Sequence, residues 1–490
     1  MVIGGAVALL GALVPGAVGA AGAAGAASTT TPTTRARGSA AVLKEISGGD
    51  AAFLGEAAKP DLKAEDHVQR EYTATGTATT YEVPDGYTAD GRWTFTPSSP
   101  APYATRVLVR APAKPKSFSG NVIVEWLNVS GGVDADPEWT QVAEELTRSG
   151  DIWVGVSAQR IGVEGGPVIV KVDVPGSEAA GKGLKAIDPT RYGSLEHPGD
   201  GYAFDIYTQV ARAVRAGAGL AGVKPKHVLA AGESQSAFAL VTYYDGVQPL
   251  TQAFDGFFVH SRGGVALPIA APGAYAGISD AISGTPVIFR TDQRAPVMDI
   301  QTETDVTSIL SSYGARQPDS DTFRLWEVAG TAHADARLIG PNASAFDCGA
   351  PINDGPLHVV AKAALHDLKA WVATGPPPPR APRLDVVDAP KVAVVRNRDG
   401  IAEGGIRTPP VDVPVSVLSG APGPNPSTIC LLSGSDTPLP DARIAELYPS
   451  RAAYLKRFDQ SADAAIKAGF VLPADRKALL AFARPDRVHG

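Results

Sequence analysis

Cysteine is scarce in this sequence, which holds only Cys348 and Cys430 among 490 residues. No CxxC pair and no HExxH segment occurs, so no motif predicts a metal site, and we expect no cofactor. In an exported protein a single disulfide between the two cysteines is favoured, and it would join the C-terminal part to the main body. Two buried free thiols are the alternative.

Long basic runs are also missing. The net charge is −7 at pH 7, and Lys and Arg do not cluster into a long run. Nucleic acid and anionic membrane surfaces are therefore not expected partners. With 44% hydrophobic and 19% charged residues, the composition instead fits an ordinary folded protein with a large core. The oligomeric state stays open.

The N-terminus lacks any Lys or Arg before its apolar stretch. Residues 1–37 are rich in Ala and Gly, and the apolar part is too short for a membrane span. Small residues at Ala21 and Ala23, or at Ala24 and Ala26, have the spacing of a signal-peptide cleavage site. We expect a signal peptide outside the fold and hence a secreted or cell-envelope protein. The missing basic residues place the true start upstream, or else make this segment a low-complexity tail.

Short β-branched runs alternate with segments of helical period. The predicted strands are 104–112, 121–129, 151–159, 227–232, 255–261, 295–301 and 323–330, and the predicted helices are 139–149, 203–218 and 357–374. This alternation predicts an α/β fold with a mostly parallel central sheet flanked by helices.

Two regions interrupt the alternation. Residues 161–199 form a long, Gly- and Pro-punctuated stretch after a strand, which is typical of a cap or pocket wall. Residues 380–490 follow a proline run and carry further strand-like and helical segments. We expect these to form a cap-like insertion and a C-terminal extension packed on the core.

The segment HVLAAGESQSAF, residues 227–238, predicts a strand, a tight turn and a helix. A nucleophilic serine on such a turn needs small residues two positions before and after it, because the strand and helix pass closely. Ser234 has Gly232 and Ser236 at these positions, whereas Ser236 would have Phe238. Ser234 is therefore the candidate nucleophile, although a serine that only caps a helix is common.

A serine nucleophile needs a base and an acid that orients the base, and in this fold class they follow in the order Ser, acid, His. His333 lies in a glycine loop after the strand 323–330. Two acids follow the preceding strand, and we expect Asp305 to orient His333, with Glu303 as the alternative. Asp299 lies inside that strand and is less suitable.

The oxyanion hole requires two backbone N–H groups. We expect one from Gln235, which follows the nucleophile, and the other from Val129 or Ser130, in the loop after the strand 121–129.

Three further residues are candidates for the substrate pocket. Asp200 and Tyr202 follow the insertion, and Arg262 at a strand end is placed to bind an anionic substrate group. A polar loop and a solvated arginine are the alternatives.

Several motifs together resemble the alpha/beta hydrolase domain family of secreted bacterial, often actinobacterial, proteins. They include LNVSGG, HPGD, AGESQSA, QTETDV and EVAGTAHAD, and the resemblance spans roughly residues 45–485. It implies an α/β-hydrolase fold, with the C-terminal extension as part of the unit, and ester hydrolysis. We expect a small-molecule ester as the substrate. It implies no particular acyl or alcohol group.

The sequence thus predicts a secreted serine hydrolase, a carboxylic-ester hydrolase that works through an acyl-enzyme. A peptidase or acyltransferase with the same residues is one alternative. A hydrolase-like binding protein without catalysis is the other.

Overall fold

The structure is a computed structural model that describes residues 38–56, 60–171, 177–278, 281, 284–388, 390–425 and 427–489. The predicted signal segment lies outside the described residues. The described residues belong to one compact unit. Within them, no helix has the length and apolar character needed to cross a membrane.

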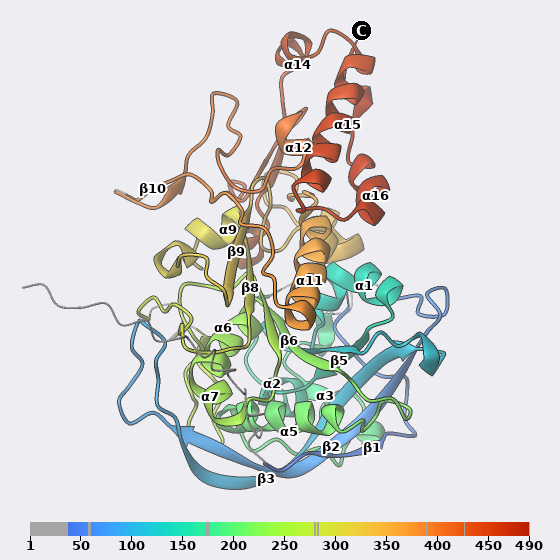
Figure 1. Ribbon diagram of the computed structural model, residues 1–490, viewed down its shortest axis with the longest axis vertical. Helices are drawn as coiled ribbons and strands as arrows, with labels where there is room; N and C mark the ends of the chain where they lie inside the picture. Colours follow the sequence, from blue (N-terminus) through green and yellow to red (C-terminus); the bar gives the residue numbers. More distant parts are fainter. Residues whose placement is uncertain are drawn as a thin grey trace, which may run out of the picture. The chain divides into compact units, whose positions relative to one another are not determined.

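A nine-stranded sheet organises the chain (Figure 1). Its strands, in spatial order, are β1 (Val42–Glu45), β2 (His67–Glu82), β3 (Thr96–Pro112), β5 (Ile152–Val156), β4 (Asn121–Trp126), β6 (His227–Glu233), β7 (Gly256–His260), β8 (Val297–Thr302) and β9 (Phe323–Val328). From β5 to β9 all neighbours pair in parallel, whereas β1, β2 and β3 pair antiparallel and β3 joins β5 antiparallel. The predicted mostly parallel α/β sheet is confirmed.

Helices cover both faces of this sheet because parallel strands must be joined by crossovers. On one face, α1 (Pro137–Ser149) and α11 (Leu357–Thr374) pack through Trp139, Leu146 and Leu365 against buried residues of β4 to β9. On the other face, α5 (Ala203–Arg215) and α6 (Gln235–Thr242) pack through Phe204, Val210 and Leu240. The helices predicted at 139–149, 203–218 and 357–374 are therefore present.

The insertion folds into short helices, namely α2 (Arg160–Glu164), α3 (Gly183–Ile187) and α4 (Pro189–Tyr192). It is held against the loop after β4 by backbone hydrogen bonds. The N–H groups of Ile169 and Val170 both donate to the Ser130 carbonyl, at 3.0 and 2.9 Å, and the Gly181 N–H donates to the Gly132 carbonyl at 2.9 Å. The insertion thus forms a wall beside this loop.

The C-terminal extension, drawn in orange to red in Figure 1, contains the strands β10 (Val386–Val387), β11 (Ala393–Val394), β12 (Ser416–Ser419) and β13 (Ser435–Pro438), with the helices α12 (Pro409–Asp412), α13 (Thr428–Leu432), α14 (Asp441–Leu447), α15 (Arg451–Lys467) and α16 (Arg476–Leu480). Ion pairs fasten it to the core. Arg148 of α1 pairs with Asp475 through two contacts of 2.8 Å, and Arg484 pairs with Asp354 in the same way.

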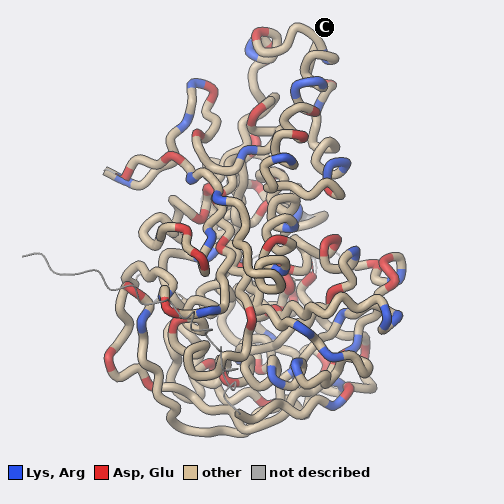
Figure 2. The backbone as a smooth tube through the Cα atoms, viewed as in Figure 1, with Lys and Arg blue, Asp and Glu red and all other residues tan. Residues whose placement is uncertain are grey.

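Lys, Arg, Asp and Glu are interspersed along the described chain (Figure 2). Buried ion pairs account for some of them, such as Arg106 with Asp134 at 2.6 Å.

Candidate active site

Ser234 lies on a strained turn between β6 and α6. Its backbone has φ 60° and ψ −123°, a conformation unusual for a residue with a side chain. The turn is tight: a Cβ atom added to Gly232 would come within 3.0 Å of the Ser236 Cβ. The small residues on either side of Ser234 therefore allow this close passage, as the sequence predicts.

Three predicted side chains meet at the carboxyl edge of the parallel strands. The Nε2 atom of His333 lies 2.8 Å from the Oγ of Ser234, and its Nδ1 atom lies 2.7 Å from the Oδ1 of Asp305. The loops after β6, β8 and β9 supply them, and these strands lie close together in the sheet. Such a chain of contacts can move a proton from a serine hydroxyl to an imidazole.

The second carboxylate oxygen of Asp305 accepts three hydrogen bonds. The Ser261 Oγ and Thr302 Oγ1 hydroxyls each donate at 2.8 Å, and the Thr302 N–H donates at 2.7 Å. Asp305 also lies at the start of α9 (Glu303–Thr307), where it forms a capping box with Thr302. These contacts leave Oδ1 directed at His333 and fix the carboxylate plane.

The Glu303 carboxylate binds backbone and arginine N–H groups and not His333. Its Oε1 accepts the Gly330 N–H at 2.6 Å, and its Oε2 accepts the Gly420 N–H at 3.0 Å and an Arg396 guanidinium N–H at 2.6 Å. It thus connects α9 with the loop after β9 and with the C-terminal extension.

Asp299, the third acid near this strand, is buried beside Arg262. Burial raises the pKa of the Asp299 carboxyl to about 6.

Two backbone N–H groups near Ser234 are suited to an oxyanion hole. Gln235 is the first residue of α6, where the N–H has no partner within the helix. Of the other two candidates, the Ser130 N–H already donates to Asn128 Oδ1 at 2.8 Å. The Val129 N–H makes only a long contact of 3.4 Å with Gln235 Oε1. Val129 is therefore the more available donor.

A cavity of about 410 Å³ opens beside Ser234 and His333. Its other walls come from segments distant in sequence: the N-terminal stretch, the insertion, α1, the loop after β9 and the C-terminal extension. The apolar lining side chains are Phe53, Leu54, Val133, Ala135, Pro137, Val170, Ala179, Ala180, Ala334, Leu338, Ile339, Phe346, Ile429 and Leu432. Its size and apolar character are typical of a small-molecule pocket.

Asp200, Tyr202 and Arg262 were predicted to line the substrate pocket. None of them lines the cavity beside Ser234, so this prediction is wrong for that cavity. Arg262 is buried, stacks on Phe289 and donates to the Val287 carbonyl at 2.9 Å, so it neutralises Asp299 inside the core. Asp200 is buried and accepts the N–H groups of Arg160 and Ala276. The Tyr202 hydroxyl lies 3.3 Å from Ser99 Oγ. These contacts organise loops around the site.

Glu138, Glu233 and His260 form a buried polar cluster next to the candidate nucleophile. The Nδ1 atom of His260 lies 3.2 Å from a Glu138 carboxylate oxygen and 3.6 Å from one of Glu233. Burial raises the pKa of both carboxyls well above the usual range. The three side chains have ligand atoms within 4.8 Å of one another and could hold a metal ion. No metal motif signals them in the sequence, because they come from α1, β6 and β7.

Sequence reasoning missed two residues that position the site. Ser261 binds Asp305, and the Asn128 side chain donates to the Glu233 carbonyl at 3.0 Å. Ser261 directly follows β7, between the strands that carry Ser234 and Asp305, so the predicted strand order could have identified it.

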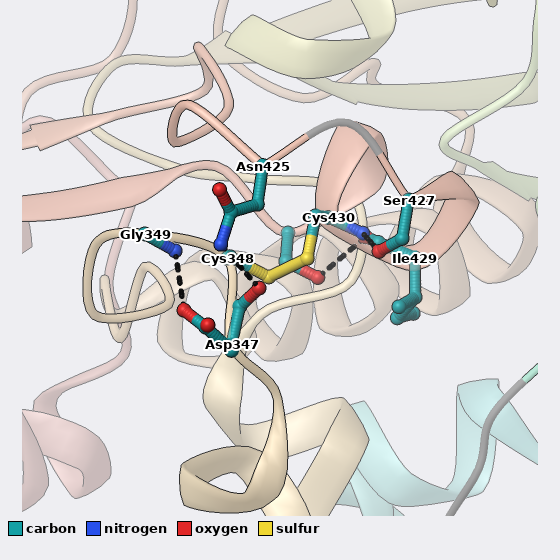
Figure 3. The surroundings of a disulfide bond; sticks show 8 residues. Asp347, Cys348, Gly349, Asn425, Ser427, Ile429 and Cys430 are labelled. Atoms are coloured by element: carbon teal, nitrogen blue, oxygen red, sulfur yellow. Dashed lines mark hydrogen bonds between the residues drawn. A yellow bond between two sulfur atoms is a disulfide. The ribbon is translucent and has the colours of Figure 1, made fainter.

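Cys348 and Cys430 form the predicted disulfide, with a Cα–Cα distance of 5.3 Å (Figure 3). It joins the loop before α11 to α13 of the extension.

A mostly parallel sheet with a strained serine after β6, a histidine after β9 and a carboxylate after β8 defines the class of α/β hydrolases. The chain belongs to the family described as the alpha/beta hydrolase domain, whose model matches residues 33–481. No curated protein sequence matches the chain.

The chain is also similar, at low identity, to solved structures of serine hydrolases and esterases. A serine hydrolase without a lid from Xanthomonas campestris is 15% identical, with 62% of this chain and 97% of that chain covered and a TM-score of 0.30. A thermostable esterase from Pseudomonas putida is 15% identical, covering 64% and 85%, with a TM-score of 0.33. A fungal esterase structure from Rhizomucor miehei is 11% identical, covering 61% and 84%, with a TM-score of 0.31. At these TM-scores the likenesses add nothing to the family assignment.

Proposed function

We propose that this protein is a serine hydrolase that cleaves carboxylic esters through an acyl-enzyme. One observation carries the proposal: Ser234, His333 and Asp305 form an unbroken hydrogen-bonded chain that ends in the apolar cavity. In α/β hydrolases this arrangement turns a weakly nucleophilic hydroxyl into an attacking group.

In the first half of the proposed reaction, the Ser234 Oγ attacks the ester carbonyl carbon while His333 Nε2 accepts its proton. Asp305 keeps the other ring nitrogen protonated and stabilises the imidazolium. The N–H groups of Gln235 and Val129 donate to the oxyanion of the tetrahedral intermediate. The C–O bond to the alcohol then breaks, and His333 returns its proton to the departing alkoxide.

In the second half, a water molecule enters the site. His333 removes one proton from this water as it attacks the acyl carbon of Ser234. Collapse of the second tetrahedral intermediate releases the carboxylic acid, and the proton returns to Ser234 Oγ. The net reaction is ester plus water giving acid plus alcohol, with no redox change and no cofactor in any step.

We further infer that the protein is exported. The disulfide between Cys348 and Cys430 supports this, because such bonds persist in oxidising compartments. The Ala- and Gly-rich N-terminal segment supplies a candidate signal. Fractionation of producing cells would test it, since a protein found only in the cytosol contradicts export.

A matched pair of serine variants tests the chemistry. Ser236 is buried, and its hydroxyl has no hydrogen-bond partner among the described residues. We expect Ser234→Ala to lower kcat for p-nitrophenyl esters by roughly 10⁴–10⁶-fold and Ser236→Ala to change it little. A fluorophosphonate probe should label wild type and Ser236→Ala but not Ser234→Ala. An unlabelled wild-type protein would favour the binding-protein alternative.

A panel of acyl acceptors separates the remaining alternatives. Water as the preferred acceptor supports an ester hydrolase. Preferential transfer to added alcohols indicates an acyltransferase, and faster cleavage of matched amides indicates a peptidase.

A further inference from the structure

One wall of the cavity is assembled from two segments that are far apart in the sequence. Phe346 lies in the loop before α11, whereas Ile429 and Leu432 lie in α13 of the C-terminal extension. The disulfide joins these segments two residues after Phe346 and one residue after Ile429. Figure 3 shows Ile429 directly beside the bridged Cys430.

Hydrogen bonds hold α13 against the loop that carries the candidate base. The N–H of Ala334, next to His333, donates to the Leu432 carbonyl at 2.9 Å. At the other end, the Asn425 N–H donates to the Cys348 carbonyl at 3.2 Å, and its side-chain amide donates to the Asp347 carbonyl at 3.0 Å (Figure 3). The position of this wall relative to His333 is therefore fixed from both sides.

The carboxyl groups that line the cavity do not offer a free charge to a substrate. Asp136 binds Arg110 at 2.6 Å, and Glu56 pairs with the same guanidinium. The Glu233 side chain is fully buried, and its carboxyl group lies 3.6 Å from the Nδ1 atom of His260. Asn128, Ser130, Thr140 and Ser177 add uncharged polar groups, and the remaining lining side chains away from Ser234 and His333 are aliphatic or aromatic. An uncharged, largely apolar group therefore fits the cavity best.

We propose that the cavity binds the apolar chain of an uncharged ester, and that the disulfide-linked wall of Phe346, Ile429 and Leu432 sets the chain length accepted. This inference rests on the proposed function and adds the substrate class and the residues that select it. The C-terminal extension thereby takes part in substrate selection, with Ile429 as a specificity-determining residue.

Substitution of the wall tests this proposal. Ile429→Trp fills the cavity with a larger side chain. Ile309→Trp is the matched control, because Ile309 is 43% exposed in the loop that follows α9. We would measure kcat/KM for p-nitrophenyl esters from acetate to dodecanoate and for acetates of alcohols of increasing length. We expect Ile429→Trp to lower kcat/KM for the long members of one series by about 10-fold or more. For the acetate ester and for esters of short alcohols, kcat/KM should stay within about threefold of the wild-type value.

Selective loss in either series supports the proposal and tells whether the acyl or the alcohol chain occupies the cavity. An equal loss at all lengths, or no loss, overturns it. Fluorophosphonate labelling of Ser234 is measured in parallel: an unlabelled wild type refutes the proposed function, whereas a labelled Ile429→Trp protein without changed selectivity refutes only this inference.

A second variant guards against a folding defect in the first. Leu432→Ala enlarges the cavity at the same wall and should shift the optimum to longer chains. The double change Cys348→Ser with Cys430→Ser should broaden the length profile, because the wall loses its covalent link. An unchanged profile in both proteins contradicts the proposal.

Discussion

Glu303 and Asp305 lie two residues apart on one helical turn, yet their carboxylates serve different partners. Asp305 reaches the His333 ring at 2.7 Å, whereas Glu303 accepts the backbone N–H groups of Gly330 and Gly420. The sequence left both as candidate acids. The contacts assign Asp305 to the histidine and Glu303 to the attachment of the C-terminal extension.

A comparison of amide variants tests this division. We expect Asp305→Asn to lower kcat by roughly 10⁴-fold, because an amide would hold His333 in the wrong tautomer. Glu303→Gln should keep kcat within about 10-fold but lower the unfolding free energy by about 1–3 kcal/mol, because a buried carboxylate that binds Arg396 is lost. Ester kinetics and urea denaturation check both. Severe loss of kcat in Glu303→Gln alone would reverse the assignment.

The packing of the nucleophile turn predicts a rescue experiment. Gly232→Ala places a Cβ atom 3.0 Å from the Ser236 Cβ and 3.2 Å from a Leu240 methyl group, and we expect it to destabilise the turn by about 1–3 kcal/mol. Adding Ser236→Gly removes the nearest atom and should restore part of the activity and of the melting temperature. If the double variant is no better than Gly232→Ala, the close approach of these two residues is not the cause of the defect.

We expect Asp335, two residues after His333, to make the unfolding free energy depend on pH. Its carboxyl is buried, and burial raises its pKa from 3.8 to about 6. The folded state therefore keeps a proton that the unfolded state releases. This contribution to stability is complete below pH 4 and is lost as the pH rises through 6.

Asp335→Asn stays uncharged and, through its amide oxygen, can still accept the Leu338 N–H at the start of α10 (Ala336–Ile339). Its unfolding free energy relative to wild type should increase between pH 4 and 6, by about 3 kcal/mol at most. Urea denaturation at several pH values measures the difference. Parallel curves for the two proteins would contradict the prediction.

The disulfide should contribute to stability because it closes a loop with a sequence separation of 82. The chain-entropy model gives about 4.5 kcal/mol for a loop of this size, which is an upper value. We expect dithiothreitol to lower the urea midpoint of the wild type and to leave the protein with Cys348→Ser and Cys430→Ser unaffected. A reductant effect of equal size on both proteins would point to another cause.

The sequence predicted the parallel strands and the three residues Ser234, Asp305 and His333, because these depend on local pattern and on chain order. Side chains that follow neighbouring parallel strands meet at one edge of the sheet. The choice between Asp305 and Glu303 could not be made in this way, since both follow β8. The direction of Glu303 depends on Gly330 and Gly420, and that of Asp305 depends in part on Ser261, and all three approach from elsewhere in the chain.

The errors have a similar origin. Arg262 follows a strand end, where active-site residues gather, but Asp299 and Phe289 enclose it. Local sequence contains no signal for that burial. The long antiparallel pair of β2 and the first part of β3 was also missed, because no helix separates these two strands and the alternation of strands with helices therefore does not indicate them.

The link between Cys348 and Cys430 also has a consequence for biosynthesis. Ile429 and Leu432 line the cavity, so a growing chain cannot complete this wall until α13 has left the ribosome. Nascent chains that end before α13 would carry Ser234, Asp305 and His333 but lack the wall beside them. Under the proposed function, the three reacting side chains are therefore synthesised before the wall that selects their substrate.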